Sequence, residues 1–169
     1  MEIKYQTIDK KDFNKNHREI LASMLKKQGK VQGNFDQKID RCKLICIAWV
    51  DNDVAAIGAI KEKTLLDFSA EKAGLPDLSD DFEWDLGYFY TQEKYAGKVI
   101  ASMIAKLLIE GYGKENLMAS TEITANPAMV NILHKHGFRL FGKPWKSNIH
   151  ENYLGLFLKF KVVPTKSSE

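Results

Sequence analysis

The chain has 169 residues, of which 44% are hydrophobic and 28% are charged. These values are typical of one globular domain and exclude a disordered, collagen-like or coiled-coil chain. The formal net charge of +3, from 25 basic and 22 acidic residues, is too small to indicate nucleic acid as a partner. We therefore expect a surface of mixed charge, one domain over residues 1–160 and a frayed tail at 161–169.

The N-terminal segment and the rest of the chain contain no apolar run of the length that a signal peptide or a membrane-spanning helix needs. The sequence thus predicts a cytoplasmic protein that does not contact a membrane. Cys42 and Cys46 lie four residues apart in an apolar run that we interpret as a strand, where their side chains would share one face. This spacing disfavours a disulfide between them, and no His or Cys partner completes a metal site, so we expect buried thiols and no metal.

The first half of the chain predicts an opening strand, two helices and a hairpin. The long helix rests on the helical spacing of Ile20, Leu21, Met24 and Leu25, with Gly29 as its end. The hairpin rests on two β-rich runs around the turn Asp51-Asn52-Asp53. The expected elements are a strand at 2–8, helices at about 12–28 and 35–42, and strands at 43–50 and 54–64.

The second half predicts strands that alternate with helices. Residues 65–82 are expected to form a surface loop with an optional short helix at 69–73, and the helix that ends near Gly111 and Gly113 has the clearest apolar stripe. The further elements are strands at 83–91, 117–123, 138–142 and 153–160, and helices at about 98–112 and 127–136. Alternation in the strand at 83–91 predicts Trp84, Leu86, Tyr88 and Tyr90 on one face and Glu83, Asp85, Gly87 and Phe89 on the other.

This order of elements predicts a fold of the α/β class, α+β type, with helices packed on a sheet. The last strand, 153–160, is apolar on both faces. That pattern fits a homodimer formed through the sheet edge and fits a central position in the sheet equally well.

Two segments carry a chemical signal. In TQEKYAGKVIAS, residues 91–102, a strand ends in a polar turn that opens a helix, a device that holds phosphates but also occurs as a plain connection. About thirty residues later, NPAMVNILHKHGF, residues 126–138, opens another helix after another strand. Together they resemble the GNAT superfamily of N-acetyltransferases, whose pattern is a pyrophosphate loop Q/R-x-x-G-x-G/A followed by a helix of the type N-x-x-A-x-x-L-Y-x-x-x-G-F.

The resemblance implies a mixed, mostly antiparallel sheet of about six to seven strands with helices on both faces, and acetyl-CoA as cosubstrate. It places the pyrophosphate loop at Ala96 to Ala101 and the pantetheine arm along the strand that precedes this loop. Ala96 replaces the usual Gln or Arg, and Val99 replaces the central Gly. The implied cofactor-binding residues are Phe89, Tyr90, Thr91, Ala96, Gly97, Lys98, Val99, Ile100, Ala101, Ser102 and Asn126, the last of which is equally a helix N-cap.

Acetyl transfer needs a base for the attacking amine and an acid for the departing thiolate. Asp85 matches the strand position where some family members place a base, and Glu83, on the same predicted face, is the second candidate. The family acid is a tyrosine in the fourth helix, and we match its position to His134. Tyr88, Tyr90 and Tyr153 are alternative acids.

Two functions follow from this resemblance. The first is an N-acetyltransferase that acts on a primary amine of a small cationic molecule or of a protein, and the acidic segment 77–85 favours a cationic acceptor. The second is a GNAT-fold module that binds acyl-CoA or a partner without turnover, which the altered loop and the absent tyrosine favour. A nucleotide-binding domain ranks below both because the chain has no Gly-x-Gly-x-x-Gly and no Walker-type lysine motif.

Overall fold

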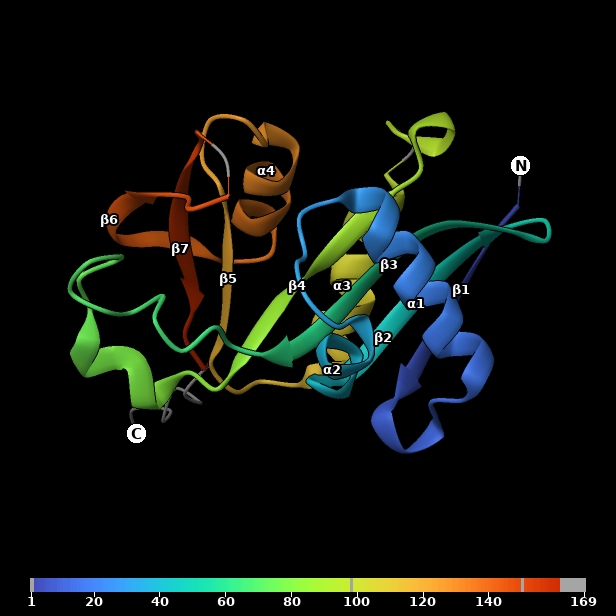
Figure 1. The fold of residues 1–169 in the computed structure, drawn as a ribbon, viewed down its shortest axis with the longest axis horizontal. Coiled ribbons are helices and arrows are strands. Elements are labelled where there is room, and N and C mark those ends of the chain that lie inside the picture. Colours follow the sequence, from blue (N-terminus) through green and yellow to red (C-terminus); the bar gives the residue numbers. More distant parts are fainter. Residues whose placement is uncertain (1, 98, 150, 162–169) are drawn as a thin grey trace, which may run out of the picture.

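A computed structural model describes residues 2–97, 99–149 and 151–161. They form a twisted sheet with helices on both faces (Figure 1). The strands are β1 (Ile3–Asp9), β2 (Cys42–Val50), β3 (Asp53–Glu62), β4 (Trp84–Thr91), β5 (Leu117–Glu122), β6 (Arg139–Lys146) and β7 (Tyr153–Lys159). The α-helices are α1 (Lys15–Gln28), α2 (Phe35–Asp40), α3 (Ile100–Tyr112) and α4 (Pro127–Lys135), and the 3-10 helices are η1 (Lys10–Asp12), η2 (Pro76–Asp81) and η3 (Glu93–Tyr95).

The sheet has seven strands in the order β1-β2-β3-β4-β5-β7-β6. Every neighbouring pair is antiparallel except β4 and β5, which run parallel. The mixed, mostly antiparallel sheet with helices on both faces confirms the predicted fold class.

Two apolar clusters hold the helices against opposite faces of the sheet. On one face α1 and α2 pack with Leu21, Leu25 and Ile39 against β2 and β3. On the other face Ile104 and Leu108 of α3, with residues of α4, pack against β2 to β5. The strands β2 and β3 are therefore covered on both sides, and burial of this kind stabilises a fold by about 25 cal/mol for each Å² of apolar surface.

The segment between β3 and β4 differs from the expected loop. Residues 69–73 form turns, and the helix of this segment is η2, Pro76–Asp81, which lies after the expected position. Pro76 stands in the first turn of η2, where its fixed φ angle favours a helix start. Phe68 and Phe82 of this segment are buried in one cluster with Met118 and Trp145.

Two β-bulges change which side chains share a face. In β4, Tyr90 pairs with Ile57 and Gly87 with Ala59, so Tyr88 and Phe89 together oppose one residue of β3. Tyr88 has a positive φ of 58°. The predicted alternation is therefore wrong beyond Gly87: Tyr88 and Tyr90 pack on the α1 face, whereas Trp84, Leu86 and Phe89 pack on the α3 face.

The second bulge lies between Cys42 and Leu44 of β2. It places Cys42 on the α1 face and Cys46 on the α3 face, so the prediction that both thiols share a face is also wrong. Both cysteines are free and buried, as expected. Burial raises the pKa of Cys42 to about 12 and that of Cys46 to about 11, which keeps both thiols protonated.

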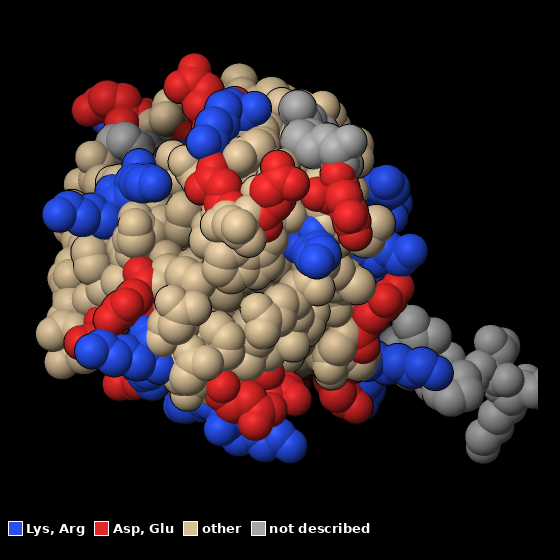
Figure 2. Space-filling model, turned by 90° about the vertical axis from the view of Figure 1, so that its right-hand side faces the viewer, with Lys and Arg blue, Asp and Glu red and all other residues tan. Residues whose placement is uncertain are grey.

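The strand β7 lies between β5 and β6 and pairs with both. Its apolar composition therefore reflects a central position, and its backbone is not free for a dimer through the sheet edge. No helix among the described residues is long and apolar enough to cross a membrane. On the face drawn in Figure 2, acidic and basic side chains are interspersed around an uncharged area, as the small net charge predicts.

Candidate functional site

The strands β4 and β5 pair at one end and separate at the other. Their only registered partners are Asp85 and Met118, and toward Thr91 the strands diverge (Figure 1). Two cavities of about 490 and 500 Å³ lie at this divergence. They share five lining residues, which are Phe89, Tyr90, Thr91, Asn126 and Met129. The two cavities therefore adjoin each other. We call them together the groove, and its parts the α3 cavity and the α1 cavity after the helix that borders each.

The α3 cavity brings together ten of the eleven residues that the sequence predicts to bind the cofactor. They are Phe89, Tyr90, Thr91, Ala96, Gly97, Val99, Ile100, Ala101, Ser102 and Asn126. Lys98, the eleventh, lies outside the described residues. The first amides of α3 have no acceptor within the helix, and the helix dipole adds positive potential at the same place. An anionic ligand such as a pyrophosphate fits this end of the cavity.

The turn before α3 is fixed to the β2–β3 hairpin. The Tyr95 hydroxyl donates a hydrogen bond to Asp53 at 2.7 Å, and the backbone N–H of Gln92 donates to the carbonyl of Ala55 at 2.8 Å. The Gln92 side chain also donates to the carbonyl of Val54. These bonds tie Gln92 and Tyr95 to the hairpin at the start of the turn.

Val99 is the N-cap of α3 and has a φ of 55°, in the left-handed region that favours glycine. Its side chain is 78% exposed. A β-branched residue at this angle is strained by about 1–2 kcal/mol. Val99 thus keeps the backbone angle that a glycine would adopt, at a cost in stability and with a side chain beside the cavity.

The α1 cavity contains a buried carboxylate. Glu122 lies at the end of β5 and is 6% exposed. Its Oε1 forms an ion pair of 2.9 Å with the Nζ of Lys30, whose side chain is 51% exposed. Its Oε2 accepts a hydrogen bond of 3.3 Å from the Asn152 amide. Both Glu122 and Lys30 line the cavity.

Gln28, the last residue of α1, closes one wall of the α1 cavity. Its Nε2 donates a hydrogen bond of 2.6 Å to the backbone carbonyl of Phe89, next to the bulge in β4. Its Oε1 is buried and has no partner among the described residues. Because the carbonyl of Phe89 is engaged, a ligand strand would pair with other polar groups of β4.

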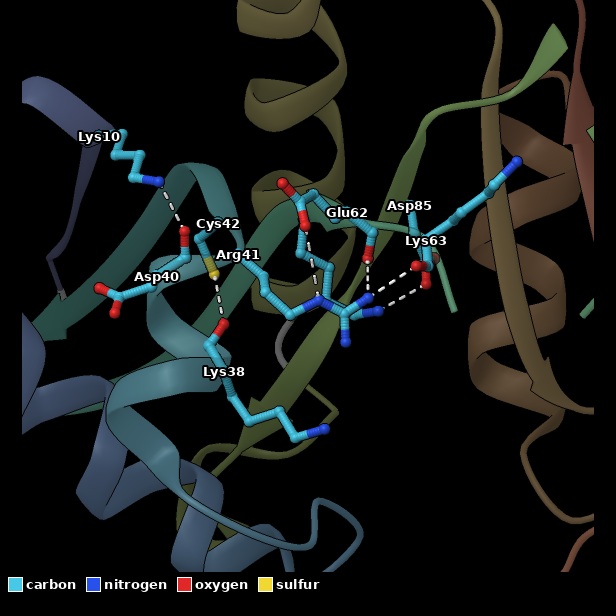
Figure 3. Close-up of polar contacts among 9 residues, drawn as sticks. Lys10, Lys38, Asp40, Arg41, Cys42, Glu62, Lys63 and Asp85 are labelled. Carbon is cyan, nitrogen blue, oxygen red and sulfur yellow. Dashed lines mark hydrogen bonds and ion pairs between the residues drawn. The ribbon is translucent and has the colours of Figure 1, made fainter. Parts of the chain in front are cut away.

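Asp85 lies at the closed end of the β4–β5 pair and lines neither cavity. It is 3% exposed, and its Oδ2 accepts a hydrogen bond of 2.6 Å from the Lys61 ammonium. Burial raises the pKa of Asp85, whereas Lys61 and Arg41 act in the opposite direction. Figure 3 shows Asp85 near Arg41, whose guanidinium donates to the carbonyls of Glu62 and Lys63 at 2.9 and 2.6 Å.

Glu83, the second predicted base, is exposed and precedes β4, so it also lies outside the groove. His134 is exposed on α4, where its ring lies 6.0 Å from that of Phe157. Leu133, one residue earlier, lines the α1 cavity together with Met129 of the same helix. The predicted catalytic residues Asp85, Glu83 and His134 are therefore not brought together.

The three tyrosines proposed as alternative acids occupy different places. Tyr90 lines both cavities, and Tyr88 lines the α1 cavity alone. Burial raises the pKa of Tyr88. Tyr153 is 56% exposed and lines neither cavity.

Sequence reasoning missed Gln28, Lys30 and Glu122. Gln28 and Lys30 stand at the end of a helix, where polar residues are ordinary. Glu122 is the last residue of β5, and the sequence of a strand does not tell which strands or side chains lie beside it. Among the described residues, no group of three or more His, Cys, Asp or Glu side chains is arranged to hold a metal.

No protein-family model matches the sequence, and no curated protein matches it significantly. Solved structures do match. The NatC complex bound to Gag peptide and CoA contains a chain that superposes with a TM-score of 0.69 at 14% identity, covering 96% of this chain and 100% of that one. Escherichia coli ElaA gives a TM-score of 0.69 at 10% identity over 92% and 99% of the two chains.

Arabidopsis thaliana NAA60 in complex with acetyl-CoA gives a TM-score of 0.66 at 13% identity, over 94% of this chain and 99% of that one. Another similar structure is described as a GNAT-family acetyltransferase of Streptococcus pneumoniae, with a TM-score of 0.61. This chain has the GNAT fold. The divergence of β4 and β5 and the loop at the start of α3 therefore belong to a GNAT fold that carries its own set of side chains in the groove.

Proposed function

We propose that this protein is an acetyl-CoA-dependent N-acyltransferase that acts on a primary amine in a ternary complex. The observation that carries the proposal is the pair of adjoining cavities that form the groove between β4 and β5. One part of it lies at the amide-rich start of α3, and the other part contains the buried carboxylate of Glu122. An anionic coenzyme and an amine would enter from opposite faces of the sheet and meet where the strands separate.

The residues of the α3 cavity fit coenzyme A. The amides at the start of α3 and the loop from Ala96 would hold its pyrophosphate, and polar backbone groups of Tyr90 and Thr91 would hold its pantetheine arm as an added strand is held. The volume of about 490 Å³ is suitable for part of such a ligand. Bound acetyl-CoA would supply an activated thioester at the divergence of the strands.

Glu122 is our candidate for the general base, in preference to Asp85. It is the carboxylate that lines the groove, and a carboxylate at this place can take the proton that an ammonium acceptor must lose. Asp85 is held by Lys61 behind the closed end of the strand pair. Its role as a base remains a hypothesis that the experiment below compares with that of Glu122.

Tyr90 is our candidate for the proton donor to the departing thiolate, because it is the one tyrosine among the three sequence candidates that lines both cavities. The α4 side chains that line the α1 cavity, Met129 and Leu133, have no proton to give. The acidic residues of η2, including Asp77 and Asp80, do not line the groove. The negative charge that would attract an amine thus comes from Glu122.

The test is acetyl transfer from acetyl-CoA to a panel of primary amines that includes polyamines, free lysine and peptides with a free N-terminus. We expect Glu122→Gln to lower kcat by about 100-fold or more, because general-base catalysis contributes that much. Glu83→Gln makes the same chemical change outside the groove and should leave kcat within a factor of about two.

If Asp85→Asn abolishes transfer and Glu122→Gln does not, while both variants stay folded, the base is Asp85. If the protein binds CoA and transfers to no amine of the panel, the alternative holds, and the chain is a GNAT-fold acyl-CoA-binding module. The observation that favours this alternative is that α4 presents Leu133 to the α1 cavity, where an acid for the thiolate would be expected.

A further inference from the structure

We propose that Lys30 is a self-acetylation site: its own ε-amine is an acceptor for the acetyl group, and the reaction occurs within one molecule. This inference rests on the proposed function. The observation behind it is that a primary amine of this chain already lies in the α1 cavity, in contact with the carboxylate that we assign as the base.

The position of Lys30 is that of an acceptor amine. Its Nζ lies 2.9 Å from Oε1 of Glu122, and its side chain lines the cavity together with Tyr88 and Tyr90 of β4. The side chain is 51% exposed, so the contact is not sealed from solvent. An external amine that needs Glu122 would have to displace this ammonium.

The loop that carries Lys30 allows the approach. It connects α1, which ends at Gln28, with α2, which begins at Phe35. Gly29 and Gly33 on either side of Lys30 have φ angles of 76° and 94°, so the backbone turns at both. A lysine adds four rotatable bonds between this backbone and its ammonium, which gives Nζ reach along the groove.

The chemistry balances with acetyl thioester as the second reactant. Glu122 takes one proton from the Lys30 ammonium, and the neutral nitrogen attacks the thioester carbonyl carbon. The C–N bond forms and the C–S bond breaks, so the sulfur leaves with the electron pair and is protonated to the thiol of CoA, while the nitrogen loses its second proton to solvent. The product is a neutral Nε-acetyl-lysine that no longer forms the ion pair with Glu122.

Lys26 provides a matched control. It lies on the last turn of α1, four residues before Lys30, is exposed and lines neither cavity. Non-enzymatic acetylation by acetyl-CoA would modify such an exposed lysine at least as fast as Lys30. A reaction in the groove would favour Lys30 alone.

The first experiment uses the full chain with acetyl-CoA and no added amine, followed by intact mass and peptide mapping. We expect a gain of one acetyl group at Lys30, with a rate constant that does not change over a 20-fold range of protein concentration. Lys30→Arg should abolish this gain, Lys26→Arg should leave it unchanged, and Glu122→Gln should slow it by about 100-fold. Equal labelling of Lys26 and Lys30, or a rate constant that rises with protein concentration, would overturn the proposal.

A second measurement needs no coenzyme. In the unloaded protein, an N-hydroxysuccinimide ester should label Lys30 several-fold more slowly than Lys26, because the ion pair with Glu122 withdraws its ammonium, and Glu122→Gln should remove this difference. Equal labelling in the parent protein contradicts the placement of Lys30. Transfer to an added amine without any acetylation of Lys30 contradicts this inference alone, whereas the absence of CoA binding contradicts the proposed function.

Discussion

Two lysine–carboxylate pairs, one at each end of the β4–β5 seam, differ in how they meet solvent. At the closed end, Lys61 and Asp85 lie 2.6 Å apart with side chains 10% and 4% exposed. At the open end, Lys30 and Glu122 lie 2.9 Å apart with side chains 51% and 8% exposed. Breaking a pair that solvent cannot reach costs much stability, because the remaining charge stays buried without a partner. A buried carboxylate with a half-exposed partner can instead exchange that partner for a ligand.

Removal of one partner from the closed pair should have the largest effect. Lys61→Met leaves the Asp85 carboxylate buried without its cation, so we expect the free energy of unfolding to fall by about 3–5 kcal/mol. Lys30→Met should change it by less than about 1 kcal/mol, because one partner of that pair is exposed. Urea denaturation of both variants measures the difference. Similar losses for the two would show that the ends of the seam are energetically alike.

The closed end should also respond to pH through Asp67. Burial, and then the nearby charge of Asp85, raise the pKa of Asp67 to about 6 from 3.8. An acid whose pKa is higher in the folded state favours folding when protonated, so its cost to stability grows as pH rises from about 4 through 6 and then levels off, because the carboxyl is ionised in both states. A rise in pKa from 3.8 to about 6 corresponds to a cost of at most about 3 kcal/mol.

We therefore expect Asp67→Asn to reduce the loss of stability between pH 5 and pH 7.5 by about 1 kcal/mol relative to the parent protein. Asp77→Asn changes an exposed carboxyl of the same segment and is the control. Chemical denaturation at both pH values measures the difference, and an Asp67→Asn profile that parallels the parent profile would refute the assigned ionisation.

The smallest change in the free energy of unfolding is expected at the open end, for substitutions of Val99. Val99→Gly relieves the strain of a β-branched residue at positive φ, which offsets the greater freedom that glycine gives the unfolded chain. We expect a gain in stability of about 1 kcal/mol or less and CoA affinity that is equal or higher. Val99→Ala retains a Cβ at the same angle and should gain less. Weaker CoA binding by Val99→Gly would mean that the valine side chain contacts the ligand.

The sequence predicted the helices and the strands because these depend on local patterns, whereas the resemblance to the GNAT superfamily pointed to ten of the residues that line the α3 cavity. Apolar spacing defined α3, and the cap and proline at Asn126 and Pro127 defined the start of α4. The bulges at Tyr88 and between Cys42 and Leu44 were missed because one inserted residue shifts the phase of a strand without changing its composition.

The charged lining of the α1 cavity was missed for a different reason. Lys30 and Glu122 are 92 positions apart and meet because β5 lies next to β4 while the end of α1 crosses their divergence. Position in a motif pointed to Asp85 and His134, and both lie outside the groove. Local patterns predict backbone elements, but the side chains that share a cavity are decided by strand order.

The most direct test of the account is a calorimetric titration of CoA into the parent protein and into Ser102→Glu. Ser102 lines the α3 cavity in the first turn of α3, where a carboxylate suits the helix dipole but repels a pyrophosphate. We predict micromolar binding by the parent protein and, in a variant of unchanged Tm, binding weaker by at least about 10-fold. No binding by the parent protein at millimolar CoA, or equal binding by both proteins, would contradict the assignment of this groove to an acyl-CoA.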